Sequence, residues 1–226
     1  MADDLRKEFH QQLDEIREGI MLVGASVSET IPRATQVLLD GDLEGAEYLI
    51  NGDDEIDTRS LELEEQCYDM LALQAPMAGD LRQIVAAVKM IGEIERSGDL
   101  AVNICKAARR IYGVPLDPRL RTMVAQMGEQ AALLFRLSID AYRDADVPLA
   151  SALDDIDDLL DRLQVDFIAQ IFECHAAEQI ELLVAVQLAL IARFYERIGD
   201  HGVNIGERVR YMVTGWLPSH DPDRVP

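Results

Sequence analysis

The sequence has few aromatic residues, few basic residues and no long hydrophobic run. Aromatic residues make up 5% of its 226 positions, which suits helices rich in leucine, isoleucine, valine and alanine better than a β-sandwich. Lysine and arginine number 21 against 42 aspartates and glutamates, a net charge of −21. Such a field repels phosphate backbones, so we expect no binding to nucleic acid and partners that offer a basic surface or a cation.

Features that would direct the chain out of the cell or into a membrane are missing as well. The N-terminus has no positively charged region leading into an apolar core, so we expect no secretion signal. The most apolar run, residues 182–194, contains Gln187 and Arg193 and is shorter than the roughly 20 residues that a membrane helix needs. The three cysteines show no CxxC spacing and are typical of small buried residues in a reducing compartment. We therefore predict a cytoplasmic protein.

Motifs for the common catalytic mechanisms are absent too. We find no Walker loop, no GxGxxG or GxSxG sequence, and no nucleophile paired with a base. The histidines have no ExxH or HExxH setting, which argues against the ferritin-like di-iron oxidases. His201 is a possible auxiliary metal ligand, although Leu100 stands at the corresponding place in the first half. The sequence thus predicts no catalytic residue and no enzyme.

Apolar residues recur every three or four positions, which is the period of one face of an α-helix. The first such stretch covers residues 5–31, and Pro32 should kink or interrupt its helix because proline removes a backbone donor. The second helix begins at Asp42, a plausible N-cap, and runs to about residue 74. Within it, Gly52 is a weak spot that could split the helix. Nothing alternates with period two, so we predict no β-sheet.

The second half of the chain repeats the plan of the first. Residues 113–118, rich in glycine and proline, end the third helix and mark our domain boundary. The turn at residues 144–148 resembles the one at residues 40–42, at a slightly different offset, and a turn near Ala176 should separate the last two helices. The later helices are expected at about residues 77–111, 119–143, 149–171 and 178–213.

These helices predict the architecture of the chain. Each is about 40–50 Å long at 1.5 Å per residue, and three helices are followed by three similar ones. We therefore predict an all-α fold of two tandem, pseudo-symmetric three-helix bundles. The expected units are residues 1–113 and 114–213, with residues 214–226 as a disordered tail.

One acidic motif occurs twice, 101 residues apart. The copies read ERSGDLAVNI at residues 95–104 and ERIGDHGVNI at residues 196–205. Glu95 falls on the apolar track of the third helix, where an unpaired charge is costly to bury. Asp99 lies four residues later, so both carboxylates project from one side of the helix on successive turns. The second copy repeats this arrangement.

A second acidic pair with the same spacing lies in the second helix. Asp53 and Asp57 have counterparts 101 residues later in the fifth helix. Folding the second helix back on the third about residue 76 brings the two acidic pairs alongside, and a turn at residue 177 does the same in the second half. Four carboxylates should therefore face each other in each half. The expected site residues are Asp53, Asp57, Glu95, Asp99, Asp154, Asp158, Glu196 and Asp200, flanked by Arg96, Asn103, Arg197 and Asn204.

Four carboxylates at one level repel each other unless something compensates. Some are then protonated, an arginine bridges them, or a cation binds. An all-oxygen ligand set favours Mg, Mn, Fe or Ca over the soft sites typical of zinc, and a two-metal carboxylate site is plausible. Two structural readings stay open. Each pair can be a solvated helix face with Arg96 or Arg197 as its ion-pair partner, and the aspartates can favour a helix N-terminus.

With these residues assembled, the chain resembles the PhoU family. The resemblance covers almost the whole length, with six helices in two repeats. Its most specific element is the motif at residues 196–205, which recurs in weaker form at residues 95–104. The first copy departs from the family pattern at Ser97 and Leu100, which predicts that the first site binds metal less well or differently.

The resemblance implies a cytoplasmic negative regulator of phosphate uptake and of the phosphate-starvation response. Such proteins are thought to connect the ATPase of the phosphate ABC transporter with a sensor histidine kinase, and we expect a homodimer. Family members carry multinuclear iron or zinc clusters on paired E(D)xxxD motifs. These carry over onto the eight acidic residues named above.

Two other functions remain compatible with the residues. One is a metal-dependent phosphohydrolase on a carboxylate-bridged site, which needs an open coordination position and a base that positions water. The other is a metal-free acidic helical adaptor with arginine-bridged clusters. Metal content and phosphatase activity discriminate among the three hypotheses.

Overall fold

The fold is all-helical in the part of the chain that the structure describes. The computed structural model describes residues 2–216, so most of the predicted tail, residues 217–226, lies outside the described residues. The elements of residues 2–216 are α1 (Ala2–Asp40), α2 (Leu43–Gln74), α3 (Gly79–Arg110), α4 (Pro118–Asp144), α5 (Val147–Ala176) and α6 (Leu182–Thr214). The predicted all-α class with two three-helix bundles is confirmed.

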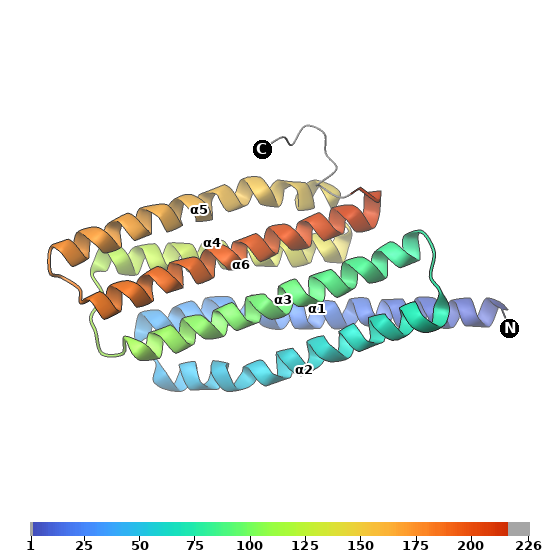
Figure 1. Cartoon of the computed structure of the whole chain (residues 1–226), viewed down its shortest axis with the longest axis horizontal. Helices are drawn as coiled ribbons and strands as arrows, with labels where there is room; N and C mark the ends of the chain where they lie inside the picture. Colours follow the sequence, from blue (N-terminus) through green and yellow to red (C-terminus); the bar gives the residue numbers. More distant parts are fainter. Residues whose placement is uncertain (1, 217–226) are drawn as a thin grey trace.

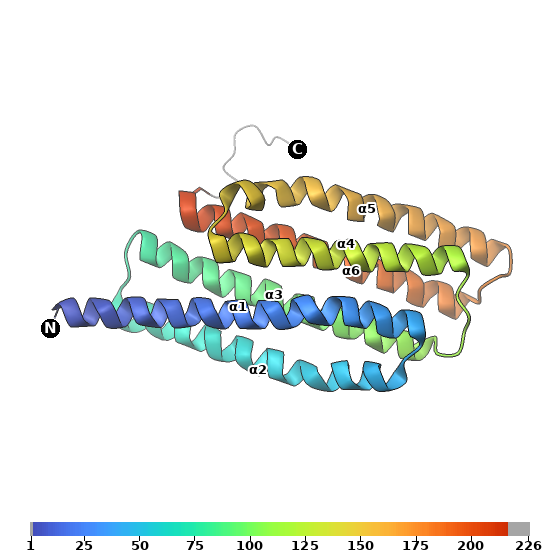
Figure 2. The ribbon, with the colours of Figure 1, turned by 180° about the vertical axis from the view of Figure 1, so that it is seen from behind.

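The six helices form two layers of long, nearly aligned rods. One face carries α5, α6, α3 and α2 in that order, with α3 and α6 in the middle (Figure 1). Seen from behind, α4 and α1 cover the opposite face (Figure 2). α3 and α6 pack against each other and also against the helices of their own repeats. Each repeat is therefore a three-helix bundle, and the bundles meet through α3 against α6 and through α1 against α4.

Aspartate N-caps at equivalent positions start the middle helix of each repeat. Asp42 Oδ1 accepts a hydrogen bond from the backbone N–H of Gly45 at 2.9 Å, and Asp146 Oδ1 accepts one from Leu149 at 2.9 Å. Such caps satisfy a backbone donor that the first helical turn leaves unpaired. The predicted N-cap at Asp42 is present, and the two caps define an offset of 104 residues between α2 and α5.

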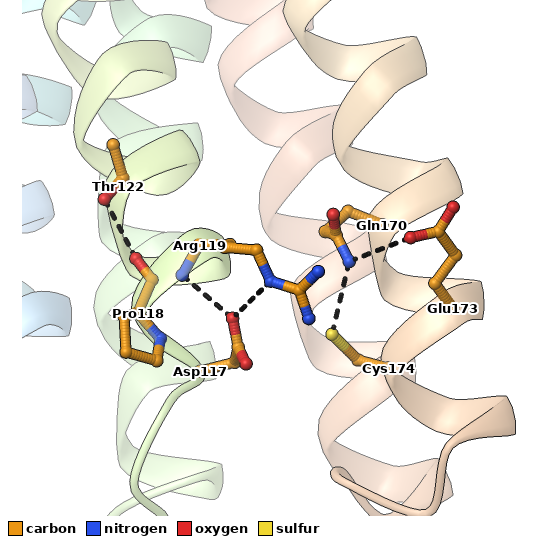
Figure 3. A network of polar contacts seen from close by, with 7 residues as sticks. All are labelled: Asp117, Pro118, Arg119, Thr122, Gln170, Glu173 and Cys174. Atoms are coloured by element: carbon orange, nitrogen blue, oxygen red, sulfur yellow. Dashed lines mark hydrogen bonds and ion pairs between the residues drawn. The ribbon is translucent and has the colours of Figure 1, made fainter.

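The second repeat begins with a cap and a proline (Figure 3). Asp117 Oδ1 accepts a hydrogen bond from the backbone N–H of Arg119 at 2.8 Å and another from the Arg119 side chain at 3.2 Å. Pro118 occupies the first turn of α4, where its missing N–H costs nothing. The Arg119 side chain extends from α4 towards α5, where Gln170 donates to the sulfur of Cys174 at 3.5 Å.

The helices differ from the sequence predictions in three places. Pro32 lies inside α1 without interrupting it, because Ile31 and Ala34 on either side are fully buried in the core and hold the helix in place. The predicted split at Gly52 is also absent, since α2 is continuous. α6 begins at Leu182 rather than near residue 178, after a turn at residues 177–181. This last difference changes the register of the second acidic site.

The two repeats share one hydrophobic core. Gly24 of α1 faces Ile139 of α4, and Gly128 of α4 faces Thr35 of α1, so the contact between these helices is two-fold symmetric. A Cβ added at Gly24 would lie 2.8 Å from the Ile139 side chain, so glycine is needed for this close approach. The Thr35 hydroxyl also lies 2.8 Å from the hydroxyl of the buried Tyr195 on α6. The bundles are thus packed together through buried side chains.

Candidate functional site

The first repeat brings its four predicted carboxylates together across α2 and α3. Burial, together with the charges of Asp57 and Asp99, raises the pKa of Asp53 to about 6. Burial and the charges of Asp99 and Asp57 likewise raise the pKa of Glu95, and burial and Asp99 raise that of Asp57. These mutual effects show that the two acidic pairs lie side by side, as antiparallel packing of the helices requires.

A lysine near this cluster offsets part of the repulsion. Lys106, about two turns beyond Asp99 on α3, lowers the pKa of Asp53 and of Asp57. Arg96 does not bridge the four carboxylates, because its guanidinium forms an ion pair with Glu93 at 2.8 Å. Asn103 is half-buried on α3. The cluster therefore keeps a net negative charge.

In the second repeat, the aspartates that lie nearest to the α6 carboxylates are not the predicted pair. Asp157 and Asp161, rather than Asp154 and Asp158, lie at the level of Glu196 and Asp200. Burial and the charges of Asp161, Asp200 and Glu196 raise the pKa of Asp157 to about 7. Burial and Asp200 raise the pKa of Asp161, and burial and Asp200 raise that of Glu196.

The residues predicted in place of these two lie on the outer side of α5. Asp158 has an exposed side chain that lies 3.9 Å from Arg162 in a loose surface ion pair. Asp154 is exposed as well, one turn before Asp157, whose pKa its charge raises. Neither residue takes the place that Asp53 or Asp57 has in the first repeat.

The register error has a simple cause in chain length. Glu95 follows the N-cap Asp42 by 53 residues, whereas Glu196 follows the N-cap Asp146 by only 50. The repeats are therefore 101 residues apart in α3 and α6 but 104 apart in α2 and α5. Applying one offset throughout selects the wrong turn of α5. The similar turns before α2 and α5 were the signal that could have identified Asp157 and Asp161.

The two sites differ in how tightly the helices close over them. A Cβ added at Gly199 would overlap Oδ1 of Asp157 and lie 2.7 Å from the Leu160 side chain. At the equivalent Gly98 the nearest side-chain atom, on Val27, is 3.5 Å away. Asp157 is accordingly only 9% exposed, whereas Asp53 is half-buried. The second site is thus packed against a glycine and the first is looser.

Arginines act differently at the second site as well. Arg193 forms an ion pair with Glu196 and lowers the pKa of Asp161. Arg197, which we expected beside the carboxylates, is exposed. Its twin Arg96 pairs with Glu93, and position 194, the twin of Glu93, is a phenylalanine. The arginine of the repeated motif therefore has no common partner in the two repeats.

A polar cluster that the sequence did not predict joins the two repeats. His201 Nδ1 on α6 donates a hydrogen bond to Oε2 of Glu93 on α3 at 2.5 Å, and the Asn204 amide donates to the same oxygen at 3.4 Å. Burial would raise the pKa of Glu93, but these hydrogen bonds and the nearby Arg96 hold it below its ordinary value. His201 thus bonds across the repeat interface, and its place in the motif gave no hint of Glu93.

The oxygen donors of both clusters suit a hard cation, but the side chains do not form a complete coordination shell. Oδ1 of Asp53, Oδ1 of Asp157 and Oε2 of Glu196 are buried oxygens without a hydrogen-bond partner, the kind of atom that a bound cation satisfies. Within residues 2–216, however, no three acidic, histidine or cysteine side chains converge closely enough to hold a metal ion as they stand. Binding would require rotation of side chains such as the exposed Asp57 and Asp161.

Comparisons with known proteins agree with this architecture. The family model described as the PhoU domain matches residues 20–108 and 124–209, one copy in each repeat. The chain is 36% identical over 220 residues to "Phosphate-specific transport system accessory protein PhoU homolog 1" of Mycobacterium tuberculosis, covering 96% of this chain and 98% of that protein. It is 34% identical over 215 residues to PhoU homolog 2 of the same organism, covering 95% and 100%.

Solved structures show the same fold. The crystal structure of PhoU from Pseudomonas aeruginosa matches with a TM-score of 0.88 and 27% identity, over 92% of this chain and 100% of that chain. The phosphate transport system regulatory protein PhoU from Streptococcus pneumoniae matches with a TM-score of 0.85 and 27% identity, over 92% and 98%. No helix of residues 2–216 is long and apolar enough to cross a membrane. With both of its repeats matched by the family model and up to 96% of its length covered by these relatives, the chain belongs to the PhoU family.

Proposed function

We propose that this protein is a cytoplasmic regulator of phosphate homeostasis, which represses phosphate uptake and the phosphate-starvation response. The observation that carries the proposal is the match of both repeats to the PhoU domain, together with relatives named as accessory proteins of the phosphate-specific transport system. Family membership supports a regulatory role in phosphate transport. The negative regulation and the partners are the finer part of the proposal.

The protein acts through contacts rather than catalysis in this proposal. Its partners are the ATPase subunit of the phosphate ABC transporter and the phosphate-sensing histidine kinase. A net charge of −21 favours partner surfaces that carry lysine and arginine, because complementary charge speeds encounter and rejects acidic partners. Basic cytoplasmic faces of membrane-bound complexes offer such surfaces.

Metal ions bind at the two acidic clusters in this proposal. Asp53, Asp57, Glu95 and Asp99 form the first ligand set. Asp157 and Asp161 replace the originally predicted Asp154 and Asp158 beside Glu196 and Asp200. The oxygen donors suit Mg, Mn or Fe, and the family resemblance adds zinc. A cation there neutralises carboxylates that burial and mutual repulsion now drive towards protonation.

Regulation is tested by removing the gene from its host. Cells that lack the protein should express a phosphate-starvation reporter during growth in high phosphate, and the wild-type gene should restore repression. Purified ATPase subunit and kinase should each bind the purified protein in a pull-down at physiological salt. A deletion strain that represses the reporter normally would contradict the proposal.

Metal binding is tested by elemental analysis of the purified protein. The double variant Asp99→Ala/Asp200→Ala removes one ligand from each cluster and should lose most of the bound metal. Undiminished metal in that variant defeats the site assignment. Metal-free wild-type protein that still binds its partners indicates the adaptor function instead. Release of phosphate from the phosphorylated kinase, dependent on added metal, indicates the hydrolase.

A further inference from the structure

A groove between α1 and α2 lies beside the first acidic cluster. It has a volume of about 1030 Å³ and reaches down to Val102 on α3. Its floor is apolar and includes the buried Val23 and Leu49. Asp53 of the acidic cluster also lines it. Apart from Asp53, the residues that line the groove take no part in the metal proposal.

Residues at a helical spacing form each wall of the groove. On α1 they are Leu22, Ser26, Glu29 and Arg33, and on α2 they are Tyr48, Gly52, Glu55 and Arg59. The α1 wall spans about 17 Å at 1.5 Å per residue. A helix of about eleven residues has this length. With α1, α2 and α3 as its neighbours, such a helix would complete a four-helix bundle.

Large apolar side chains at the rim of the groove are exposed to solvent, which is unfavourable unless a partner covers them. Leu22 is 63% exposed and Tyr48 is 65% exposed, one on each wall. Gly52 adds no side chain at all, and the space where its Cβ would lie contains no atom within 4 Å. An apolar floor between two helices, with apolar side chains at the rim, is the arrangement that receives the apolar face of a partner helix.

The charges at the rim specify the polar face of the occupant. The two arginines of the groove are engaged by their neighbours, Arg59 with Glu62 at 3.3 Å and Arg33 over the Tyr48 ring at 5.4 Å. Glu29 and Glu55 have no ion-pair partner among the described residues. The groove thus offers unpaired negative charge beside an apolar floor.

The second repeat lacks the side chains that make this groove. At the offset of 104 residues, Leu133 and Leu137 replace Glu29 and Arg33, and Ile156 replaces Gly52. Leu134, the twin of Thr30, is almost fully buried. The polar side chains and the open space at Gly52 therefore occur in the first repeat only, and the three-helix bundle as such does not require them.

We infer that the groove between α1 and α2 is the docking site for an amphipathic helix of a partner protein, with an apolar face and flanking lysine or arginine residues. The apolar face lies on Val23, Leu49 and Val102, and the basic residues pair with Glu29 and Glu55. This inference deepens the proposed function, because it names the surface and the chemistry by which a regulatory partner binds. Its test does not use the phosphate system.

The test measures binding of a designed probe by fluorescence anisotropy at physiological salt. The probe is a fluorescein-labelled 18-residue peptide of leucine and lysine, with leucines at the i, i+3, i+4, i+7 spacing. A second peptide of the same composition has its leucines spread around the helix, so it keeps the charge and loses the apolar face. The wild-type protein should bind the amphipathic peptide at least tenfold more tightly than the scrambled one.

Gly52→Leu is the decisive variant, because it fills the groove without changing the charge. The added side chain enters open space, and leucine in a helix interior is favoured over glycine by about 1 kcal/mol. The variant should therefore unfold in urea at the same or a higher concentration than the wild type, so a binding defect cannot be loss of fold. Its affinity for the amphipathic peptide should fall at least tenfold, to the level of the scrambled peptide.

Control variants separate groove binding from simple attraction to an acidic protein. Gly79→Leu, at the start of α3 and outside the groove, makes the same change and should leave peptide affinity unchanged. Glu29→Gln/Glu55→Gln should weaken binding about three- to tenfold, because each exposed pair contributes less than about 1 kcal/mol. Equal peptide binding by Gly52→Leu and the wild type overturns the inference, as does equal binding of both peptides.

Another occupant of the groove also has a distinct outcome. If a second copy of this chain fills it, sedimentation will show a dimer that Gly52→Leu converts to a monomer, with no peptide effect, and the inference fails. The reporter assay and the pull-downs with the ATPase and the kinase test the proposed function. The peptide result stands apart from both.

Discussion

Asp53 in the first repeat and Asp157 in the second occupy equivalent turns of equivalent helices, yet their surroundings differ. Thr30 lines the same groove as Asp53, whereas its twin Leu134 is almost fully buried and lies near Gly199. Lys106 lowers the pKa of Asp53, whereas the twin of Lys106 is Glu207. Burial therefore raises the pKa of Asp157 to about 7 and that of Asp53 only to about 6.

This difference shows that a duplicated acidic motif does not by itself duplicate a site. The carboxylates on α3 and α6 are conserved between the two halves of this chain, but the helices that cover them are not. At the second site Gly199 and leucine side chains pack around Asp157, whereas Asp53 at the first site lines the groove between α1 and α2. Experiments that treat the twins in parallel can test how far the two sites differ.

The largest contrast is expected from the glycines under the two sites. Gly199→Ala should lower the free energy of unfolding by about 1–3 kcal/mol, because the added methyl overpacks a filled interior against Asp157 and Leu160. Gly98→Ala is the matched control. Its methyl would lie 3.5 Å from Val27, so it should be neutral or stabilise by up to about 1 kcal/mol. Urea unfolding measures both, and equal effects would contradict the difference in packing.

A second contrast lies in the pH dependence of stability. The folded-state pKa of Asp157, about 7, lies above its ordinary value of 3.8, so the folded protein holds this proton more tightly than the unfolded chain does. The carboxyl thus favours folding below about pH 4, and that contribution is lost as the pH rises towards 7. Asp157→Asn should remove this loss and stabilise the protein at pH 8 by about 1–3 kcal/mol. This range follows from about 1.4 kcal/mol per pKa unit, reduced for solvent screening.

Asp53→Asn is the control for this pH profile. Its effect should be smaller and should end nearer pH 6, the raised pKa of Asp53. Urea unfolding from pH 4 to pH 8, with a chelator present to remove metal ions, gives both profiles. Identical profiles for the two variants would show that the burial of the two sites does not differ in solution.

The smallest contrast concerns the register of the second site. If both clusters bind metal as proposed, manganese at about ten times its dissociation constant should stabilise the protein by about 1.4 kcal/mol per site, or about 3–5 °C in Tm for a chain of this size. Asp157→Asn/Asp161→Asn should lose roughly half of the total shift. Asp154→Asn/Asp158→Asn should keep it. If instead the Asp154/Asp158 variant loses the shift and the Asp157/Asp161 variant keeps it, the ligands on α5 are Asp154 and Asp158, as the offset of 101 residues predicts.

Most of the fold was predictable from the sequence because apolar periodicity is a property of each helix alone. The first cluster was predictable too, since the turn between α2 and α3 lies close to residue 76 and places Asp53 beside Asp99. The second cluster was not, because three residues are missing between Asp146 and Glu196 relative to the first repeat. A three-residue shift moves a helical site by almost one turn, which periodicity cannot detect.

Contacts between helices that are distant in sequence were also beyond prediction. The hydrogen bond from His201 to Glu93 depends on how α6 packs against α3. The groove depends on side chains that are missing, such as the one at Gly52, and no local pattern marks an absence as functional. Pro32 was misjudged because the lost backbone hydrogen bond is small compared with the burial of the residues around it.

The symmetric contact of Gly24 with Ile139 and Gly128 with Thr35 is the isologous type that relates two subunits of a homodimer. In a homodimer every substitution appears on both sides of the axis, so a half-buried and a buried aspartate could not stand at equivalent positions. Joining the two units in one chain removes that constraint. Each molecule then carries one cluster with a half-buried aspartate, Asp53, and one with a buried aspartate, Asp157, always in a one-to-one ratio, whatever the concentration of the protein.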